Sequence, residues 1–148
     1  MIQDPGARSA PQPTPSTTLV VRALVDPVVE AHGFAATSRY VETVWLGVLG
    51  PTATWTYRRL GSLAEVRPDG ATVDLVDLAQ SLGLGEGLGK NSLLMRALAR
   101  LVNFDVARWE GDVLAVRRRL APLPERQVSR LSASAARAHV QLTGRPRP

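Results

Sequence analysis

Two amphipathic segments joined by a glycine-rich turn constrain the fold of this chain more than any other feature. The segments "VDLVDLAQSLGL" (Val73–Leu84) and "NSLLMRALARLVNF" (Asn91–Phe104) place their apolar residues at helical spacing. The following stretch "VARWEGDVLAVRRRL" (Val106–Leu120) alternates instead, which predicts a β-hairpin with Glu110–Asp112 at its tip. In the second strand we expect Leu114, Val116 and Leu120 to point inward, and Ala115, Arg117 and Arg119 to point outward.

Both predicted helices carry N-terminal capping signals. Asp74 is a natural N-cap, and Asp77 three residues later resembles a capping box with Asp in place of Glu. Asn91 or Ser92 can cap the second helix, and Gly83 ends the first. The second helix has an apolar side made of Leu94, Ala97, Leu98, Leu101 and Val102, and a side made mostly of Ser92, Arg96, Arg100 and Asn103.

The glycine-rich stretch "GLGEGLGKNS" (Gly83–Ser92) lacks the features of a phosphate-binding loop. With Gly89-Lys90 as the anchor, that motif requires a glycine where Leu84 stands and a hydroxyl where Asn91 stands. The preceding segment is a predicted helix and not a strand, and a G-x-G-x-x-G fingerprint is absent as well. We therefore expect a turn with helix caps here, and neither a bound nucleotide nor another cofactor.

The rest of the chain divides by composition into one domain between two tails. Residues 1–18 hold prolines among Ser, Thr and Gln, which predicts a disordered tail, and residues 143–148 are similar. The single domain, residues 19–142, is expected to contain N-terminal helices over 19–66, the two helices and hairpin over 72–123, and a terminal helix over 124–142.

The N-terminal helices are predicted from residues that start or end helices and from the spacing of apolar residues. "TTLVVRALVDPVVEAHGF" (Thr17–Phe34) suggests a first helical region, in which Asp26 and Pro27 open a short helix and Gly33 closes it as a C′ residue. A buried stripe follows, made of Val41, Val44, Trp45, Val48 and Leu49. Pro51 then starts a helix to Val66. These helices either support the core or form a homodimer surface.

Charge and composition limit the classes of function. The net charge is +5 at pH 7, and Lys90 is the only lysine among 18 basic residues. The planar guanidinium of arginine suits phosphate and guanine. The absence of cysteine excludes disulfides, thiol nucleophiles and cysteine-ligated zinc. His32 and His139 are isolated from each other and from further ligands, so we expect no metal site.

Neither catalysis nor a membrane location is indicated. The chain has no G-x-S-x-G or H-E-x-x-H motif, and its carboxylates are scattered over predicted helix faces and caps, so we expect no enzyme. No apolar run approaches the length that spans a bilayer, and the first residues lack a secretory apolar region. We therefore expect a cytoplasmic, nucleoid-associated protein.

From about Thr72 to Leu123 the chain resembles the winged helix-turn-helix superfamily, through the two helices and hairpin quoted above. It also resembles small actinobacterial proteins with the layout "WLGVLGPTATW" (Trp45–Trp55) and "LARLV.F.VAR" (Leu98–Arg108). The resemblance implies a mostly α, α+β domain that binds double-stranded DNA as a small transcriptional regulator or nucleoid-type protein. The DNA contacts that it implies, on a recognition helix and a basic wing, are Lys90, Asn91, Ser92, Arg96, Arg100, Asn103, Arg117 and Arg119. The turn of Gly83–Lys90 departs from the family, because it is longer than the usual 3–4 residues.

Simpler interpretations stand beside these. Arg96 and Arg100 occupy a polar helix face, as arginines do in most proteins, and Arg117–Arg119 are also consistent with a solvated strand end. Trp45 and Trp55 are expected in the core, and Trp109 either covers the core or touches DNA. A winged helix also serves as a non-catalytic protein-interaction adaptor. One continuous basic face would favour DNA, and scattered arginines would favour the adaptor.

Overall fold

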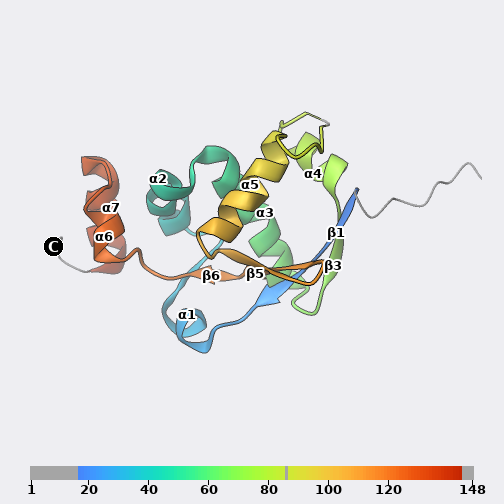
Figure 1. The fold of residues 1–148 in the computed structure, drawn as a ribbon. Coiled ribbons are helices and arrows are strands. Elements are labelled where there is room, and N and C mark those ends of the chain that lie inside the picture. Colours follow the sequence, from blue (N-terminus) through green and yellow to red (C-terminus); the bar gives the residue numbers. More distant parts are fainter. Residues whose placement is uncertain (1–16, 86, 145–148) are drawn as a thin grey trace, which may run out of the picture.

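The structure, a computed structural model, describes residues 17–85 and 87–144 and has an α+β architecture (Figure 1). The helices are α1 (Pro27–His32), the π-helical turn η2 (Val41–Trp45), α2 (Leu46–Leu49), α3 (Pro51–Val66), α4 (Leu75–Ser81), α5 (Leu93–Asn103), α6 (Glu125–Val128) and α7 (Ala133–Thr143). The strands are β1 (Thr18–Leu24), β2 (Phe34–Ala35), β3 (Ala71–Asp74), β4 (Ala107–Glu110), β5 (Val113–Arg117) and β6 (Arg119–Leu120).

A four-stranded sheet organises the molecule, in the order β3-β1-β5-β4. The strand β1 lies between β3, to which it is antiparallel, and β5, to which it is parallel. The strands β4 and β5 form the predicted hairpin around Gly111 and Asp112, and Gly111 has the positive φ of 66° that such a tight turn favours. The helices α3, α4 and α5 gather over one side of this sheet in Figure 1. The small strands β2 and β6 form a separate pair.

The core fills the space between the sheet and these helices. Leu19 and Val21 of β1 are buried there with Leu114 and Val116 of β5, as the alternation of each strand requires. The buried side chains of α5 are Leu94, Ala97, Leu98 and Leu101, which confirms the predicted apolar side except for the partly buried Val102. The outward position of Ala115 did not leave it exposed, because its cross-strand neighbours on β1 and β4 are the long side chains of Arg22 and Arg108.

The largest correction concerns Thr17–Phe34, where a helical region was expected. Residues Thr18–Leu24 form the strand β1 instead, and only Pro27–His32 is helical. The cap was predicted correctly, because the Asp26 carboxylate accepts hydrogen bonds from the amides of Val28 and Val29. Gly33 does follow the helix, but its φ of −86° is not left-handed. A Cβ there would clash with the Val29 carbonyl oxygen, so glycine is required for the close approach of the two backbone segments.

The predicted helix over Val73–Leu84 is shorter than expected. Val73 and Asp74 belong to the strand β3, and α4 begins at Leu75. The Asp74 carboxylate caps α4 by accepting from the amides of Val76 and Asp77, as its position predicted. The helix α3 has the predicted bounds, Pro51–Val66.

The C-terminal region contains two helices where a single terminal helix was expected. The first, α6, ends at Val128, and the second, α7, starts after Ser132, whose hydroxyl accepts from the amide of Ala135. His139 of α7 is buried and shares a 2.8 Å hydrogen bond with the Tyr40 hydroxyl, so it anchors this region to the core.

The predicted tails are partly ordered at their inner ends. Thr18 belongs to β1 and Thr143 to α7. The remainder of both predictions, residues 1–16 and 145–148, lies outside the described residues.

Candidate nucleic-acid interface

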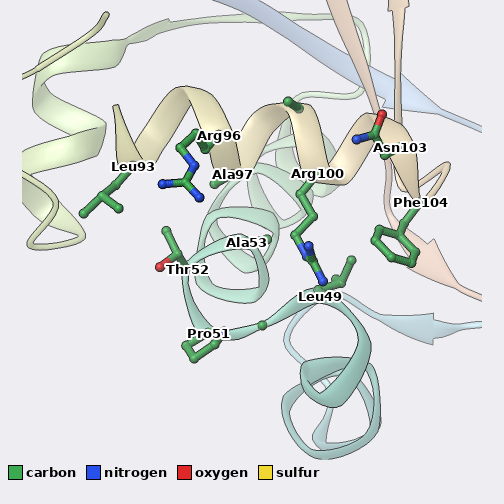
Figure 2. Close-up of a pocket in the computed structure, with 12 residues that line it drawn as sticks. Leu49, Pro51, Thr52, Ala53, Leu93, Arg96, Ala97, Arg100, Asn103 and Phe104 are labelled. Atoms are coloured by element: carbon green, nitrogen blue, oxygen red, sulfur yellow. The ribbon is translucent and has the colours of Figure 1, made fainter. Parts of the chain in front are cut away.

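The outer side of α5 borders a groove of about 490 Å³. Its opposite wall is the junction of α2 and α3, and Figure 2 shows Arg96 and Arg100 reaching from α5 towards this junction. We call this groove the α5 groove. Its lining residues are Leu49, Gly50, Pro51, Thr52, Ala53, Leu93, Arg96, Ala97, Ala99, Arg100, Asn103 and Phe104. Three of the predicted contact residues, Arg96, Arg100 and Asn103, therefore lie together.

The two arginines of the α5 groove have different surroundings. Arg100 is held in place, because its Nη2 donates a 2.9 Å hydrogen bond to the Val48 carbonyl oxygen. The Arg100 guanidinium also lies 5.1 Å from the centre of the Phe104 ring. Arg96 is exposed, and its side chain makes no hydrogen bond or ion pair with any described residue. The charge of Arg96 is therefore available to an external anion.

The charged side chains that line the α5 groove among the described residues are both arginines, Arg96 and Arg100. No described carboxylate lines it, and α5 itself contains none. The first turn of α3, beginning at Pro51, forms part of the wall and has no side-chain cap. The free amides and the dipole of a helix N-terminus add a partial positive charge at such a position. The groove therefore attracts anions from both walls.

The remaining predicted residues of this region lie at the start of α5. Lys90 and Asn91 are exposed in the turn that precedes the helix. Ser92 is the N-cap, and its hydroxyl accepts from the Met95 amide at 3.3 Å, so the choice between Asn91 and Ser92 is resolved in favour of Ser92. These three residues directly precede the first turn of α5 in the chain.

A second, smaller cavity of about 350 Å³ adjoins the α5 groove. We call it the Trp55 slot, and its lining residues are Pro51, Thr52, Trp55, Arg59, Ser81, Leu82 and Leu84. Pro51 and Thr52 line both cavities, so the two are neighbours around the first turn of α3. No described carboxylate lines the Trp55 slot either.

Trp55 is the residue that sequence reasoning misplaced here. It was expected in the core, yet 51% of its surface is exposed. Trp45 was placed correctly, because it is 9% exposed and its indole N–H donates to the Ala121 carbonyl oxygen. The available signal was the i, i+4 spacing of Pro51, Trp55 and Arg59, which puts a polar residue on the same side of α3 as the tryptophan.

The arginines of the hairpin do not join this surface. Arg117 is 13% exposed in its side chain, and its Nε donates to the Asp105 carbonyl oxygen at 2.7 Å. Its Nη2 lies 3.0 Å from the Asp105 carboxylate. Arg119 lies 3.6 Å from the Glu65 carboxylate, and Arg118 pairs with Glu30. Their charges are thus matched by carboxylates of other elements.

The tip of the hairpin has the opposite charge to the one expected for a basic wing. Glu110 and Asp112 flank Gly111 there, and Arg22 of β1 pairs with Glu110. Arg117 stands at the far end of β5 from this tip. The acidic tip therefore does not match the expected basic wing. The expected exposed arginines of α5, Arg96 and Arg100, do lie together.

Among the residues that the structure describes, no three His, Cys, Asp or Glu side chains gather as a metal site. Within the same residues, no helix has the length and apolarity to cross a membrane.

Comparisons with protein-family models, with curated proteins and with solved structures find no match to this chain.

Proposed function

We propose that this protein binds double-stranded DNA through α5, as a small regulator or nucleoid-type protein of winged helix-turn-helix type. The order of elements supports the proposal, since α3, β3, α4 and α5 are followed directly by the β4–β5 hairpin. The structure departs from the usual winged helix-turn-helix in two ways. Residues 82–92 separate α4 from α5, and β1 stands between β3 and β5 in the sheet.

The observation that carries the proposal is the charge of the Arg96 side chain, which pairs with no described carboxylate, in a groove that no described carboxylate lines. An α-helix fits the major groove of DNA, and an arginine near its N-terminal end can reach phosphate or the O6 and N7 atoms of guanine. Lys90 and Asn91, exposed beside the helix start, suit phosphate. Arg100 is partly committed to Val48 and contributes charge more than a flexible contact.

The hairpin has a different part in this proposal. Arg117 and Arg119 are assigned to the structure of the domain, because carboxylates already pair with them. The acidic tip at Asp112 points to an approach in which DNA follows α5 and the turn before it, away from the tip. The proposed binding residues are therefore Lys90, Asn91 and Arg96, with support from Arg100 and Asn103.

The test is fluorescence anisotropy of a labelled duplex at several salt concentrations, with wild type, Arg96→Ala and Arg67→Ala. Arg67 is the matched control, since it is exposed and lies at the opposite end of α3 from the α5 groove. Wild type should bind with an affinity that falls steeply with salt. Arg96→Ala should weaken binding and, for a phosphate contact, reduce the salt slope by about 0.9, whereas Arg67→Ala should leave both unchanged.

A protein-interaction adaptor is the second candidate, favoured by the exposed side chains of Trp55 and Leu93 beside the basic surface. Absence of duplex binding by wild type at low salt would overturn DNA recognition in favour of this candidate. Equal losses in Arg96→Ala and Arg67→Ala would show attraction by overall charge alone, and would overturn the assignment to α5.

A further inference from the structure

We propose that the Trp55 slot holds an unpaired nucleobase of the DNA that α5 binds, so that the preferred ligand is a duplex with an adjoining single-stranded segment. This inference rests on the proposed function and deepens it. It concerns a part of the surface, on α3 and the end of α4, that DNA recognition by α5 does not explain.

The first observation is that the Trp55 ring is held in position although it is exposed. The guanidinium of Arg58 lies 5.0 Å from the ring centre. Arg58 is itself fixed, because its Nη1 donates to the Ser38 carbonyl oxygen at 3.2 Å and its Nη2 lies 3.4 Å from the Glu42 carboxylate. An exposed aromatic ring that a fixed cation orients is a preorganised surface for stacking.

The second observation is the chemistry of the walls. Apolar atoms come from Trp55, Leu82 and Leu84, and polar groups come from Arg59 and Ser81. The Arg59 guanidinium donates a 3.1 Å hydrogen bond to the Ser81 hydroxyl, so its position in the slot is defined as well. A flat apolar surface with a cation at its margin suits a base together with its phosphate.

The third observation is position. Pro51 and Thr52 join the Trp55 slot to the α5 groove, and no described carboxylate interrupts the two. A strand that leaves a duplex bound at α5 can therefore continue into the slot without meeting a described negative charge. A base pair inside the duplex has both faces stacked on its neighbours and cannot also stack on Trp55, so the proposed occupant is an unpaired base.

The experiment compares three ligands of the same duplex sequence by anisotropy. The first ligand is a blunt duplex. The second has a single-stranded extension of about ten nucleotides, a length within the range of known single-strand binding sites. The third has an extension of equal length made of abasic residues, which keeps every phosphate but removes the bases. The proteins are wild type, Trp55→Ala, Trp55→Phe and Trp109→Ala. Trp109 is the matched control, being 45% exposed on the hairpin and outside both cavities.

Wild type should bind the base-containing extension about 5- to 150-fold more tightly than the abasic one, which is the range for stacking of one base. Trp55→Ala should remove this advantage and leave blunt-duplex affinity unchanged, Trp55→Phe should retain part of it, and Trp109→Ala should retain all of it. Circular dichroism of each variant confirms that the fold is intact.

Three results would overturn the inference, and they separate it from the proposed function. If wild type binds the blunt duplex through Arg96 but gains nothing from unpaired bases, the stacking role is wrong and duplex recognition stands. If wild type binds none of the three ligands, both proposals fail, and the slot is then better explained as a protein-docking site. An advantage that survives in Trp55→Ala would place the stacking elsewhere.

Discussion

The outer side of α5 and the β4–β5 hairpin both carry arginines, but the fold treats them in opposite ways. On α5, Arg96 is exposed and faces no described carboxylate. On the hairpin, Arg117 is largely buried between Asp105 and Asp26. An arginine whose charge is already paired with carboxylates of the same fold has little free charge with which to bind a phosphate. Basic composition therefore identifies a binding surface only where the structure leaves the charge unmatched.

The largest expected effect comes from the inner side of α5. Leu101→Ala should lower the free energy of unfolding by about 2–5 kcal/mol, because Leu101 is fully buried and its loss leaves a cavity. Urea denaturation followed by circular dichroism measures this. Ala99→Gly, on the exposed side of the same helix, is the control and should cost only about 1 kcal/mol. Equal effects would contradict the packing of α5 described here.

Arg117→Ala separates the structural arginines from the binding ones. Its loss should lower the free energy of unfolding by about 1–3 kcal/mol, since it leaves the Asp105 carbonyl oxygen without its side-chain donor. Arg96→Ala, in contrast, should change stability by less than about 0.5 kcal/mol. Urea denaturation gives both values. If Arg117→Ala left stability unchanged and weakened DNA binding, the division into structural arginines on the hairpin and binding arginines on α5 would be wrong.

Ser92→Ala tests how far the start of α5 depends on its cap. The hydroxyl accepts from the Met95 amide, so we expect a loss of about 1 kcal/mol in the free energy of unfolding. Ser92→Asp is the paired variant and should keep the stability, because aspartate caps equally well. Thermal or urea denaturation measures both. If Asn91→Ala had the larger effect, the cap would have to be reassigned.

The smallest effect is expected at the hairpin tip. Asp112→Asn removes a negative charge there, and stability should change by less than about 0.5 kcal/mol. If DNA passes away from the tip, its affinity for wild type and variant should agree near 0.1 M salt, where charges more than about 10 Å away are screened. A severalfold gain in affinity would show that DNA runs across the tip and would revise the proposed approach.

Much of the local structure was predictable from the sequence. The caps at Asp26 and Asp74 and the bounds Pro51–Val66 of α3 follow from side-chain and proline positions within one helical turn. The hairpin followed from its alternation and from Gly111. These signals are local, because a cap or a tight turn depends on residues that are neighbours in the chain.

The strand β1 illustrates what local pattern misses. Its sequence "TLVVRAL" is short and fits either a helix or a strand, and its outcome depends on pairing with β5, about ninety residues away in the chain. The sequence pattern also missed the break between α6 and α7, which divides the single helix expected over 124–142. The β propensity of a segment such as Thr18–Leu24 produces a strand only when partner strands are present.

The sequence by itself determined the helix caps, the amphipathic sides of α5 and the surplus of arginine. Tertiary structure alone decided which arginines keep a free charge, since Asp26 and Glu65 reach Arg117 and Arg119 from distant parts of the chain. It also decided that Trp55 is exposed in a slot that adjoins the α5 groove, rather than buried like Trp45. The reason is physical: solvation and charge pairing are properties of neighbours in space, and the order of residues specifies those neighbours only through the completed fold.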